Sequence, residues 1–554
     1  MNKKERSPQN KRILDRLPYL FCIFSALLFA CSMIVNRSYF RHLVHDSVVW
    51  YQIRQVLALL LLFFVGYLFL KVIQHHLPDR WICLLAFPTA VCLWCFCSEF
   101  LLLADFTYRF WRVCFLIGAG ILACYLFRRV RHIPLQAVAL PAGKTLAVVV
   151  GVCCLVSTGC TYVVFNYDSY FYFSDYGKAL TLMMSYKDIL SDNSFVLTNI
   201  GQFLPLVSSY MTYWGLDSGA PVLGFLTVNL YAAFGVAVYE RVRTRFSTKR
   251  AACYAGFSLL LLASCSGFFL YTHWVLSNTY ILFYLFFLFY LGNEHWKAPS
   301  VDRALLISLY ALAVTMLRKD GLIIVCFVLI CYSVRKLYSS WILALLFLPS
   351  AGYQLFYIYW LRHIIYAQTT LAYGTSLLSD NFMKLILLGV VGTFVYLLLL
   401  HLIADRILKR YLPHAMTLFL FAALCYFMTE SLTRSIDFVD TWLRNLSGFG
   451  FGFCMLQILL LVTSVLLIQK PPAADASGNR KEPMPSRYRY TWFFVLGNVL
   501  VTLIIYRQKG NLEIGIDNSG LRALYQIIPV FYYAAMTTIA PLFEKPLITD
   551  NRKK

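Results

Sequence analysis

Long apolar runs recur along most of the chain, and they constrain its fold more than any other feature of the sequence. Runs such as 56–73, 81–104 and 145–165 reach about the 20 residues that a helix needs to cross a hydrocarbon core. These runs are continuous rather than alternating, which is typical of transmembrane helices. Only 14% of the residues are charged, against about a quarter in soluble domains. The sequence therefore predicts an all-α polytopic membrane protein.

About 13–16 transmembrane helices are predicted, a range left open because several apolar runs are shorter than 17 residues. The predicted spans are 17–35, 54–72, 81–104, 110–127, 145–165, 221–239, 251–271, 275–291, 303–317, 321–335, 341–360, 384–402, 415–429, 448–468, 491–506 and 522–542. Short runs such as 303–317 and 321–335 are the ones expected to be broken or re-entrant.

The chain divides into three predicted regions. Residues 1–144 form an N-terminal membrane region with four helices, and residues 145–336 form a core that contains one long outer loop, 166–220. Residues 337–554 hold the C-terminal membrane helices. A polar linker rich in Pro, Gly and Ser, 470–489, interrupts this last region and is predicted to be cytoplasmic.

The placement of positive charge predicts the orientation. Roughly two-thirds of the 49 Lys and Arg residues fall in alternate connecting segments that include both ends of the chain. We therefore expect the protein to lie in the plasma membrane with both termini in the cytoplasm. Loop 166–220 is then expected on the outer side of the membrane. Anionic membrane lipids account for the net charge of +23 better than a nucleic acid does, because the charge lies in short loops.

Loop 166–220 is the best candidate for chemistry, because the rest of the chain keeps its connections short. Asp168 and Asp175 open it, and Asp168 lies among aromatic residues that include Tyr170. A carboxylate directly after a span is often only a solvated helix-end residue, and Asp175 is spaced to pair with Lys178. An aromatic setting is unusual for a solvated carboxylate, which favours Asp168 as a catalytic base.

Cations on the predicted outer face complete the candidate site. Arg318 and Lys319 lie between two short spans, and Arg522 precedes the last span. A carboxylate that takes a proton from an attacking hydroxyl, with cations that hold a leaving phosphate, suits transfer from a phosphate-linked donor. Each cation alone also fits a contact with lipid phosphates. His273, beside Trp274, is a candidate substrate contact that fits an interfacial belt equally well.

No metal or nucleotide motif accompanies these residues. The 17 cysteines lie in or beside apolar runs, and we interpret Cys92, Cys95 and Cys97 as small core residues. The sequence has no P-loop, GxGxxG or HExxH pattern. No cofactor is therefore assigned, and a divalent metal is left open without a residue cluster to support it.

The order of motifs around the outer loop resembles the GT-C superfamily of membrane glycosyltransferases. Asp168 follows a core span, and an amphipathic segment comes after it. The stretches 202–205 (Gln-Phe-Leu-Pro) and 213–215 (Tyr-Trp-Gly) follow, and the next span begins at 220–223 with Ala-Pro-Val-Leu. The resemblance covers about 145–336, and the late stretch 521–529 is similar to an Arg–Tyr–Pro span of that family.

The resemblance implies a GT-C-like fold and an inverting transfer of a sugar from a polyprenyl-phosphate donor. Asp168 then inherits the role of general base, and Tyr170, Gln202 and His273 become substrate-binding candidates. Many family members carry a second acidic residue directly after this Asp, whereas this chain has Ser169, so Asp175 is the alternative second carboxylate. The expected partners are the lipid-linked donor, an envelope glycan, lipid or protein acceptor, and membrane lipids.

Two other classes of function stay open. A transporter or flippase for lipid-linked glycans would place an ionisable residue within a span, and Glu99 is the clearest such residue. A polysaccharide polymerase or ligase would share the outer arginines but would not need Asp168. The carboxylate at the head of the outer loop favours the glycosyltransferase.

Overall fold

The computed structural model describes most of the first 403 residues and one later helix. The described residues are 8–39, 48–74, 77–133, 140–160, 174–190, 201–216, 219–244, 246–265, 277–297, 300–318, 321–334, 340–368, 380–403, 415, 436, 526 and 528–540. The predicted spans 415–429, 448–468 and 491–506 and the linker 470–489 therefore lie almost wholly outside them.

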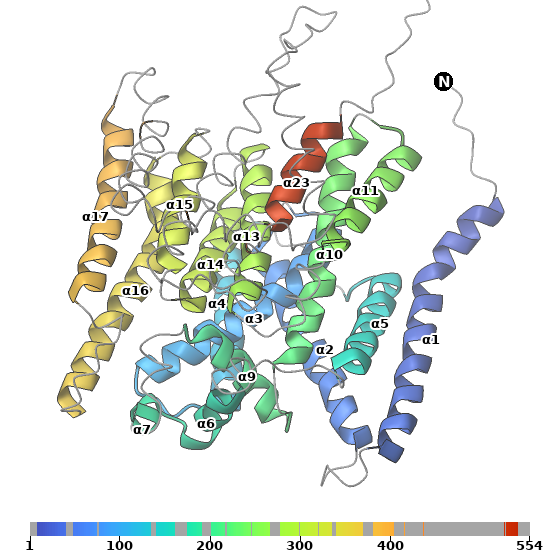
Figure 1. The fold of residues 1–554 in the computed structure, drawn as a ribbon, viewed down its shortest axis with the longest axis horizontal. Coiled ribbons are helices and arrows are strands. Elements are labelled where there is room, and N and C mark those ends of the chain that lie inside the picture. The colour runs from blue at the N-terminus through green and yellow to red at the C-terminus, as the bar shows by residue number, and fades with distance from the viewer. Residues whose placement is uncertain are drawn as a thin grey trace, which may run out of the picture.

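The described residues form helices and short connections, and none of them lies in a strand. Figure 1 shows the arrangement. The helices are α1 (Pro8–Tyr39), α2 (Val48–Ile73), α3 (Asp79–Leu103), α4 (Phe110–Val130), α5 (Gly143–Cys160), α6 (Tyr176–Met183), α7 (Tyr186–Leu190), α9 (Phe203–Tyr213), α10 (Ala220–Arg243), α11 (Thr248–Ala263), α13 (Ser277–Lys297), α14 (Val301–Leu317), α15 (Gly321–Val334), α16 (Ser340–Gln368), α17 (Asp380–Leu402) and α23 (Ile528–Ile539).

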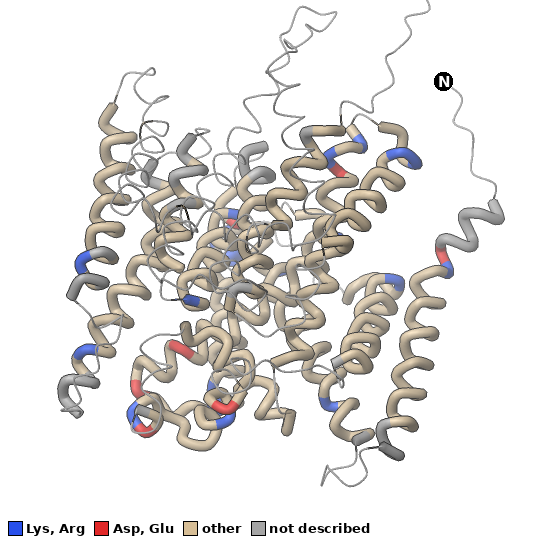
Figure 2. The backbone as a smooth tube through the Cα atoms, in the orientation of Figure 1, with Lys and Arg blue, Asp and Glu red and all other residues tan. Residues whose placement is uncertain are grey.

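Six of the described helices are long and apolar enough to cross a membrane. They lie within α1, α2, α3, α4, α10 and α16. Four more described helices are apolar but shorter, and these are α5, α13, α17 and α23. Charged residues gather near the ends of the long helices and in the short helices at the bottom of the view (Figure 2). The protein is therefore a multi-pass membrane protein, and its described part is all-helical.

Helix α3 occupies the centre of the bundle, packed against α2, α4, α9, α10 and α14. Its approach to α2 is very close, because a Cβ atom added to Gly66 would lie 1.8 Å from the carbonyl oxygen of Ala86. Side-chain hydrogen bonds also join α3 to its neighbours. The Trp81 indole N–H donates to the Glu240 carboxylate of α10 at 3.1 Å, and the hydroxyls of Thr89 and Tyr310 lie 2.9 Å apart. Helices of the predicted N-terminal region and core thus share one hydrophobic interior.

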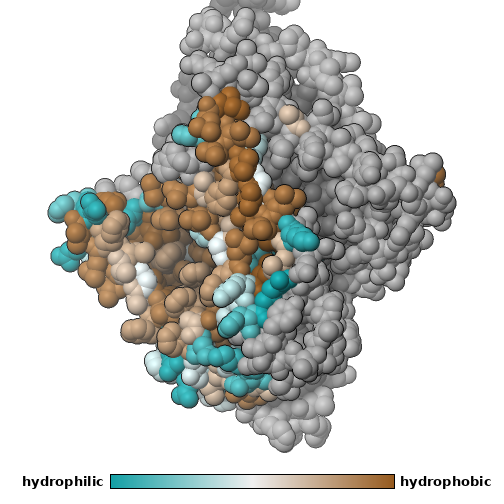
Figure 3. All heavy atoms as spheres, turned by 90° about the vertical axis from the view of Figure 1, so that its left-hand side faces the viewer, coloured by the Kyte–Doolittle hydropathy of each residue, from teal (hydrophilic) through white to brown (hydrophobic). Residues whose placement is uncertain are grey.

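Two helices lie at the outside of the bundle. In the most hydrophobic 18-residue stretch of α4, only 11% of the residues are buried, and in that of α1 only 17%. Their exposed faces are hydrophobic, as expected for surfaces that meet lipid tails. A third view shows a band of hydrophobic residues above a hydrophilic lower edge on another face of the molecule (Figure 3).

The described residues between α5 and α10 form three short helices, α6, α7 and α9, which lie together below the bundle (Figure 1). We call these three helices the lower layer. The Trp94 indole N–H of α3 donates to the carbonyl of Leu206 at 3.0 Å, and the Tyr108 hydroxyl lies 2.5 Å from that of Ser209. Lys187 forms an ion pair with Asp105, just after α3. The lower layer is therefore docked on the bundle by polar as well as apolar contacts.

Candidate functional site

Three of the site residues predicted from the sequence are among the described residues: Asp175, Gln202 and Arg318. The other five lie outside the described residues, and they are Asp168, Tyr170, His273, Lys319 and Arg522. Asp168 precedes helix α6 by a few residues along the chain, and Lys319 follows Arg318 directly. The described part of the site is therefore built from the first three.

Asp175 immediately precedes helix α6. Its carboxylate lies 4.0 Å from the ammonium nitrogen of Lys178, in the predicted i,i+3 arrangement. The contact is at the limit of an ion pair, and the Asp175 side chain keeps 41% of its surface exposed. A pair of this kind contributes little to stability. The Asp175 carboxylate is accessible from solvent, and the neighbouring lysine does not hold it tightly.

Gln202 lies at the start of α9, and its side chain is fully buried. Its backbone carbonyl accepts the first turn's hydrogen bond from the N–H of Leu206 at 3.2 Å. Its side chain hydrogen-bonds the hydroxyl of Tyr357 on α16. Gln202 therefore links the lower layer to a tyrosine that is more than 150 positions away in the sequence.

Gly201 brings Gln202 close to Arg318. A Cβ atom added to Gly201 would lie 2.2 Å from the carbonyl oxygen of Met316 and 2.3 Å from the carbonyl carbon of Leu317. The two backbones can approach this closely only because residue 201 has no side chain. Arg318 follows Leu317 directly and ends α14 in an extended conformation, with φ −150° and ψ 151°. Two residues predicted from distant parts of the sequence thus flank one backbone contact.

The chain turns at Arg318, between the end of α14 and the start of α15. The carbonyl of Arg318 accepts a hydrogen bond from the N–H of Gly321 at 2.9 Å, at the start of α15. A Cβ atom on Gly321 would lie 2.1 Å from the carbonyl oxygen of Val314, so this turn also depends on a glycine. The connection between two short helices expected from the sequence is confirmed, and it lies beside the lower layer.

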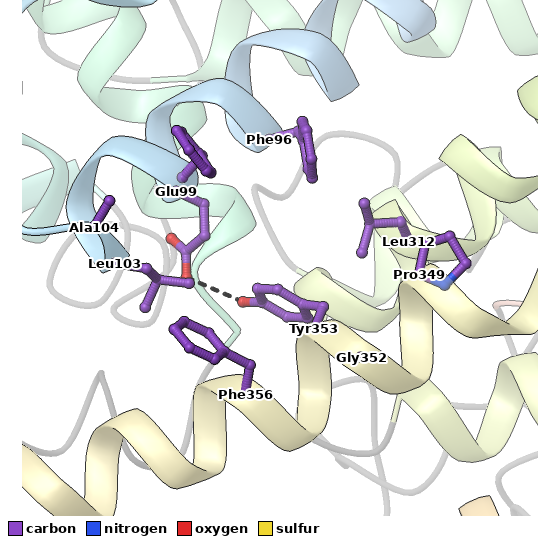
Figure 4. A pocket seen from close by; sticks show the side chains of 10 residues that line it. Phe96, Glu99, Leu103, Ala104, Leu312, Pro349, Gly352, Tyr353 and Phe356 are labelled. Atoms are coloured by element: carbon purple, nitrogen blue, oxygen red, sulfur yellow. Dashed lines mark hydrogen bonds between the residues drawn. The ribbon is translucent and has the colours of Figure 1, made fainter.

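Glu99 forms a second polar centre. In the sequence it stands out only as an ionisable residue within a span, as expected in a transporter. It lies one turn before the end of α3 rather than in the middle of the span, and only 2% of its surface is exposed. One carboxylate oxygen accepts a hydrogen bond from the Tyr186 hydroxyl of α7. The other accepts from the Tyr353 hydroxyl of α16 at 3.1 Å (Figure 4). Glu99 therefore connects α3, the lower layer and α16.

Tyr176 of α6 and Tyr357 of α16 are also buried near Glu99. Burial raises the pKa of Tyr176 and of Tyr186 well above the usual value, and the negative charge of Glu99 raises both further. These two phenols therefore stay protonated throughout the physiological range. The Tyr176 hydroxyl is buried without a hydrogen-bond partner among the described residues. We call Glu99, Tyr176, Tyr186, Tyr353 and Tyr357 the Glu99 cluster.

A cavity of about 420 Å³ lies beside the Glu99 cluster, between α3 and α16, with Leu312 of α14 also in its wall. The aromatic residues Phe96, Phe356 and Tyr353 line it (Figure 4), and so does Phe100. The Glu99 side chain extends from α3 toward Tyr353 (Figure 4). The cavity is apolar apart from these two polar side chains.

Only Glu99 of this cluster could be recognised from the amino-acid sequence. Glu99 stands out as a carboxylate inside an apolar run. The tyrosines do not stand out, because the chain contains 38 of them. Tyr353 and Tyr357 share one helical face by their i,i+4 spacing, but nothing in the sequence pairs that face with α3 or α7. Only the packing of three distant segments reveals the cluster.

Comparison with known protein families, with curated proteins and with solved structures finds no match for this chain. Among the described residues, no group of three or more His, Cys, Asp or Glu side chains is placed to hold a metal ion. Cys92 and Cys95 are buried in α3, and all the described cysteines are free thiols. The functional argument therefore rests on the geometry around Gln202, Arg318 and Glu99.

Proposed function

We propose that this chain is a GT-C-like membrane glycosyltransferase. It moves a sugar from a polyprenyl-phosphate donor to a cell-envelope acceptor on the outer face of the plasma membrane, with inversion at the sugar carbon. Asp168 acts as the general base for the acceptor hydroxyl, and Asp175 is the accessory carboxylate. Arg318, Lys319 and Arg522 bind the donor phosphate, while Tyr170, Gln202 and His273 contact the substrates.

The contact between Gly201 and the end of α14 is the observation that carries this proposal. It brings the lower layer, which continues from the segment holding Asp168, against the helix end that carries Arg318. A base and a phosphate-binding cation must reach the two ends of one transferred sugar, so they have to lie on the same side of the bundle. The contact brings Gln202 and Arg318 together, and this supports the proposal that the base and the phosphate-binding cation lie on one side of the bundle.

Replacing Asp168 with Asn tests the proposal. Asn keeps the shape of the side chain and removes the base, so we expect insertion and folding to be unchanged. Transfer should fall by about 10²-fold or more. The measurement is transfer of labelled sugar from a panel of polyprenyl-phosphate monosaccharides to extracted envelope acceptors, with purified protein in lipid nanodiscs.

Asp175→Asn is the matched control, because Asp175 also belongs to the outer loop but is exposed and only loosely paired with Lys178. We expect it to reduce transfer far less than Asp168→Asn does. If Asp175→Asn is inactive and Asp168→Asn is active, the base has been assigned to the wrong carboxylate. Full activity of both variants would contradict the glycosyltransferase proposal.

A transporter for lipid-linked glycans is the second candidate, favoured by the burial of Glu99 within α3. In that case Glu99→Gln should abolish movement of a fluorescent lipid-linked glycan across proteoliposomes. Asp168→Asn should then leave that movement intact. The glycosyltransferase proposal predicts no protein-dependent movement in the same vesicles, so the two functions are separated by one assay.

A further inference from the structure

The cavity between α3 and α16 combines an apolar wall with one acidic group. Its volume of about 420 Å³ falls within the range of roughly 300–1,000 Å³ typical of small-molecule pockets. A hydrocarbon chain alone would make favourable contacts with most of the residues that line the cavity. It would leave the Glu99 carboxylate against alkyl groups, which is unfavourable for a polar group. The occupant that fits best therefore carries both an apolar body and a polar head.

The Glu99 carboxylate has room to accept more hydrogen bonds. Each of its oxygens accepts one bond, from Tyr186 and from Tyr353. A carboxylate offers about four lone-pair positions, so two remain. Glu99 itself lines the cavity (Figure 4). The polar head of the occupant should therefore be a hydrogen-bond donor or a cation.

The surroundings of Glu99 favour a cation. No described Lys or Arg residue forms an ion pair with it, so the described residues supply no opposite charge. Phe96, Phe100 and Phe356 line the same cavity, and the faces of aromatic rings attract ammonium groups. A buried carboxylate gains most from a partner that brings the missing positive charge. A phosphate head would be repelled.

We propose that this cavity binds an amphiphile with an ammonium head. The head lies between the Glu99 carboxylate and the aromatic rings, and the apolar body fills the space between α3 and α16. This site is distinct in chemistry from the phosphate-binding cations of the proposed glycosyl transfer. The proposed site does not depend on the glycosyltransferase proposal, and a binding experiment alone can test it.

Photoactivatable decyl probes test the proposal. Three probes share a diazirine near the end of the chain and differ only in the head, which is trimethylammonium, glucoside or phosphate. The purified full-length protein is labelled in nanodiscs, and labelled peptides of α3 and α16 are quantified by mass spectrometry. We expect the ammonium probe to label these peptides at least about tenfold more than either of the others, because only its head carries the charge opposite to that of Glu99. A factor of ten corresponds to about 1.4 kcal/mol of preferential binding.

Two variants separate the contribution of the ligand's polar head to labelling from that of its apolar body. Glu99→Gln should remove the preference for ammonium and leave the weaker labelling by the glucoside probe. Gly352→Leu should reduce labelling by all three probes, because it fills the cavity; residue 352 lines the cavity, and a Cβ atom there meets nothing within 4 Å. Glu240→Gln, which changes a glutamate far from the cavity in α10, should behave like the parent.

Three results would overturn the proposal. One is equal labelling by the ammonium and glucoside probes in the parent, which would identify a hydroxylated ligand instead. Another is an ammonium preference that survives in Glu99→Gln. The third is strong labelling of α3 and α16 that persists in Gly352→Leu, which would place the probe on the lipid-facing surface. The Gly352→Leu result applies even if Glu99→Gln fails to fold.

Discussion

At the scale of single residues, Glu99 illustrates how a polar group can be kept inside an apolar bundle. Tyrosine hydroxyls from α7 and α16 supply its hydrogen bonds, so the burial of its carboxylate does not leave both oxygens unsatisfied. The same two bonds connect the short helix α7 and the long apolar helix α16 to α3. Removal of either tyrosine hydroxyl should therefore weaken the packing of α3, α7 and α16 against one another.

Tyr186→Phe should lower the free energy of unfolding by about 1–3 kcal/mol. The substitution keeps the ring and removes the donor, which leaves one oxygen of a buried carboxylate without its partner. Chemical unfolding in detergent micelles, followed by near-UV circular dichroism, measures the change. Tyr359→Phe is the control, because the Tyr359 side chain is 67% exposed on α16, and we expect it to change stability by less than about 0.5 kcal/mol.

Arg318→Ala should slow sugar transfer by well over tenfold and raise the donor concentration needed for half-maximal rate. The reason is loss of a charge-assisted contact to the donor phosphate. Arg112→Ala is the matched control, since Arg112 is a half-buried cation near the start of α4 that hydrogen-bonds the carbonyl of Thr107. Equal activity of Arg318→Ala and the parent would assign Arg318 to lipid headgroups.

The sequence was a good guide to helices and a weaker one to their contacts. Runs 54–72, 81–104 and 110–127 lie within or nearly within α2, α3 and α4, because continuous apolar residues have few other stable forms in a membrane. Short amphipathic helices were expected in the outer loop as part of a GT-C-like fold, but the local pattern indicated only an amphipathic turn or two at 178–184 and gave no bounds for α6, α7 and α9. Their folding depends on docking against α3 and α4, which no local pattern encodes.

Residue contacts that are local in sequence could be predicted, whereas those between distant segments could not. The Asp175–Lys178 spacing predicted the observed pair, because residues three apart share a helical face. The approach of Gly201 to Leu317 and the bond of Glu99 to Tyr353 join segments more than a hundred positions apart. Asp168, the residue on which the proposed chemistry depends most, lies outside the described residues.

At the scale of elements, the contact between α6 and α9 shows how the lower layer depends on a small residue. A Cβ atom on Gly177 would lie 2.6 Å from the Cβ of Ser208 and 2.8 Å from the carbonyl oxygen of Pro205. Real Cβ atoms do not approach this closely, so the two helices would have to move apart. Asp175, the accessory carboxylate of the proposed site, immediately precedes α6, so the position of α6 also sets the position of Asp175.

Gly177→Ala should loosen the lower layer and destabilise the protein by about 1–3 kcal/mol, as expected for an overpacked contact. Proteolysis within 174–216 should become faster, as measured by limited digestion of the protein in nanodiscs. Gly118→Ala in α4 is the control, since a Cβ atom there meets nothing within 4 Å. Because alanine favours a helix over glycine, this control should be neutral or slightly stabilising. Similar digestion rates for both variants would contradict the tight contact.

At the scale of the whole molecule, the two ends of the bundle differ in construction. One end carries the lower layer and the proposed substrate site. The other carries ion pairs between helix ends, such as Arg128–Asp302 at 3.0 Å and Lys71–Asp79 at 2.6 Å. By the positive-inside rule we expect the second end to face the cytoplasm, because roughly two-thirds of the Lys and Arg residues fall in the connecting segments predicted on that side. With this orientation, only substrates outside the cell would reach the proposed site.

Cysteine labelling tests the orientation. A cysteine at Ser185, between α6 and α7, should react with a membrane-impermeant maleimide from outside intact cells. A cysteine at Ser247, which caps α11 at the other end, should react only after the cells are opened. The parent, with its native cysteines, sets the background for each condition. Labelling of both positions from the same side would contradict the predicted topology and with it an outward-facing site.

The pairing of α1 with α5 has a consequence for how the chain enters the membrane. Helix α1 packs mainly against α5, and about a hundred residues separate the two in the sequence. At about 5–20 residues per second, synthesis reaches α5 some 5–20 s after α1 has left the ribosome. During that interval α1 must remain in the bilayer by its own hydropathy, surrounded by lipid and early helices. The largest contact of α1 is thus completed late, after three intervening helices have already been inserted.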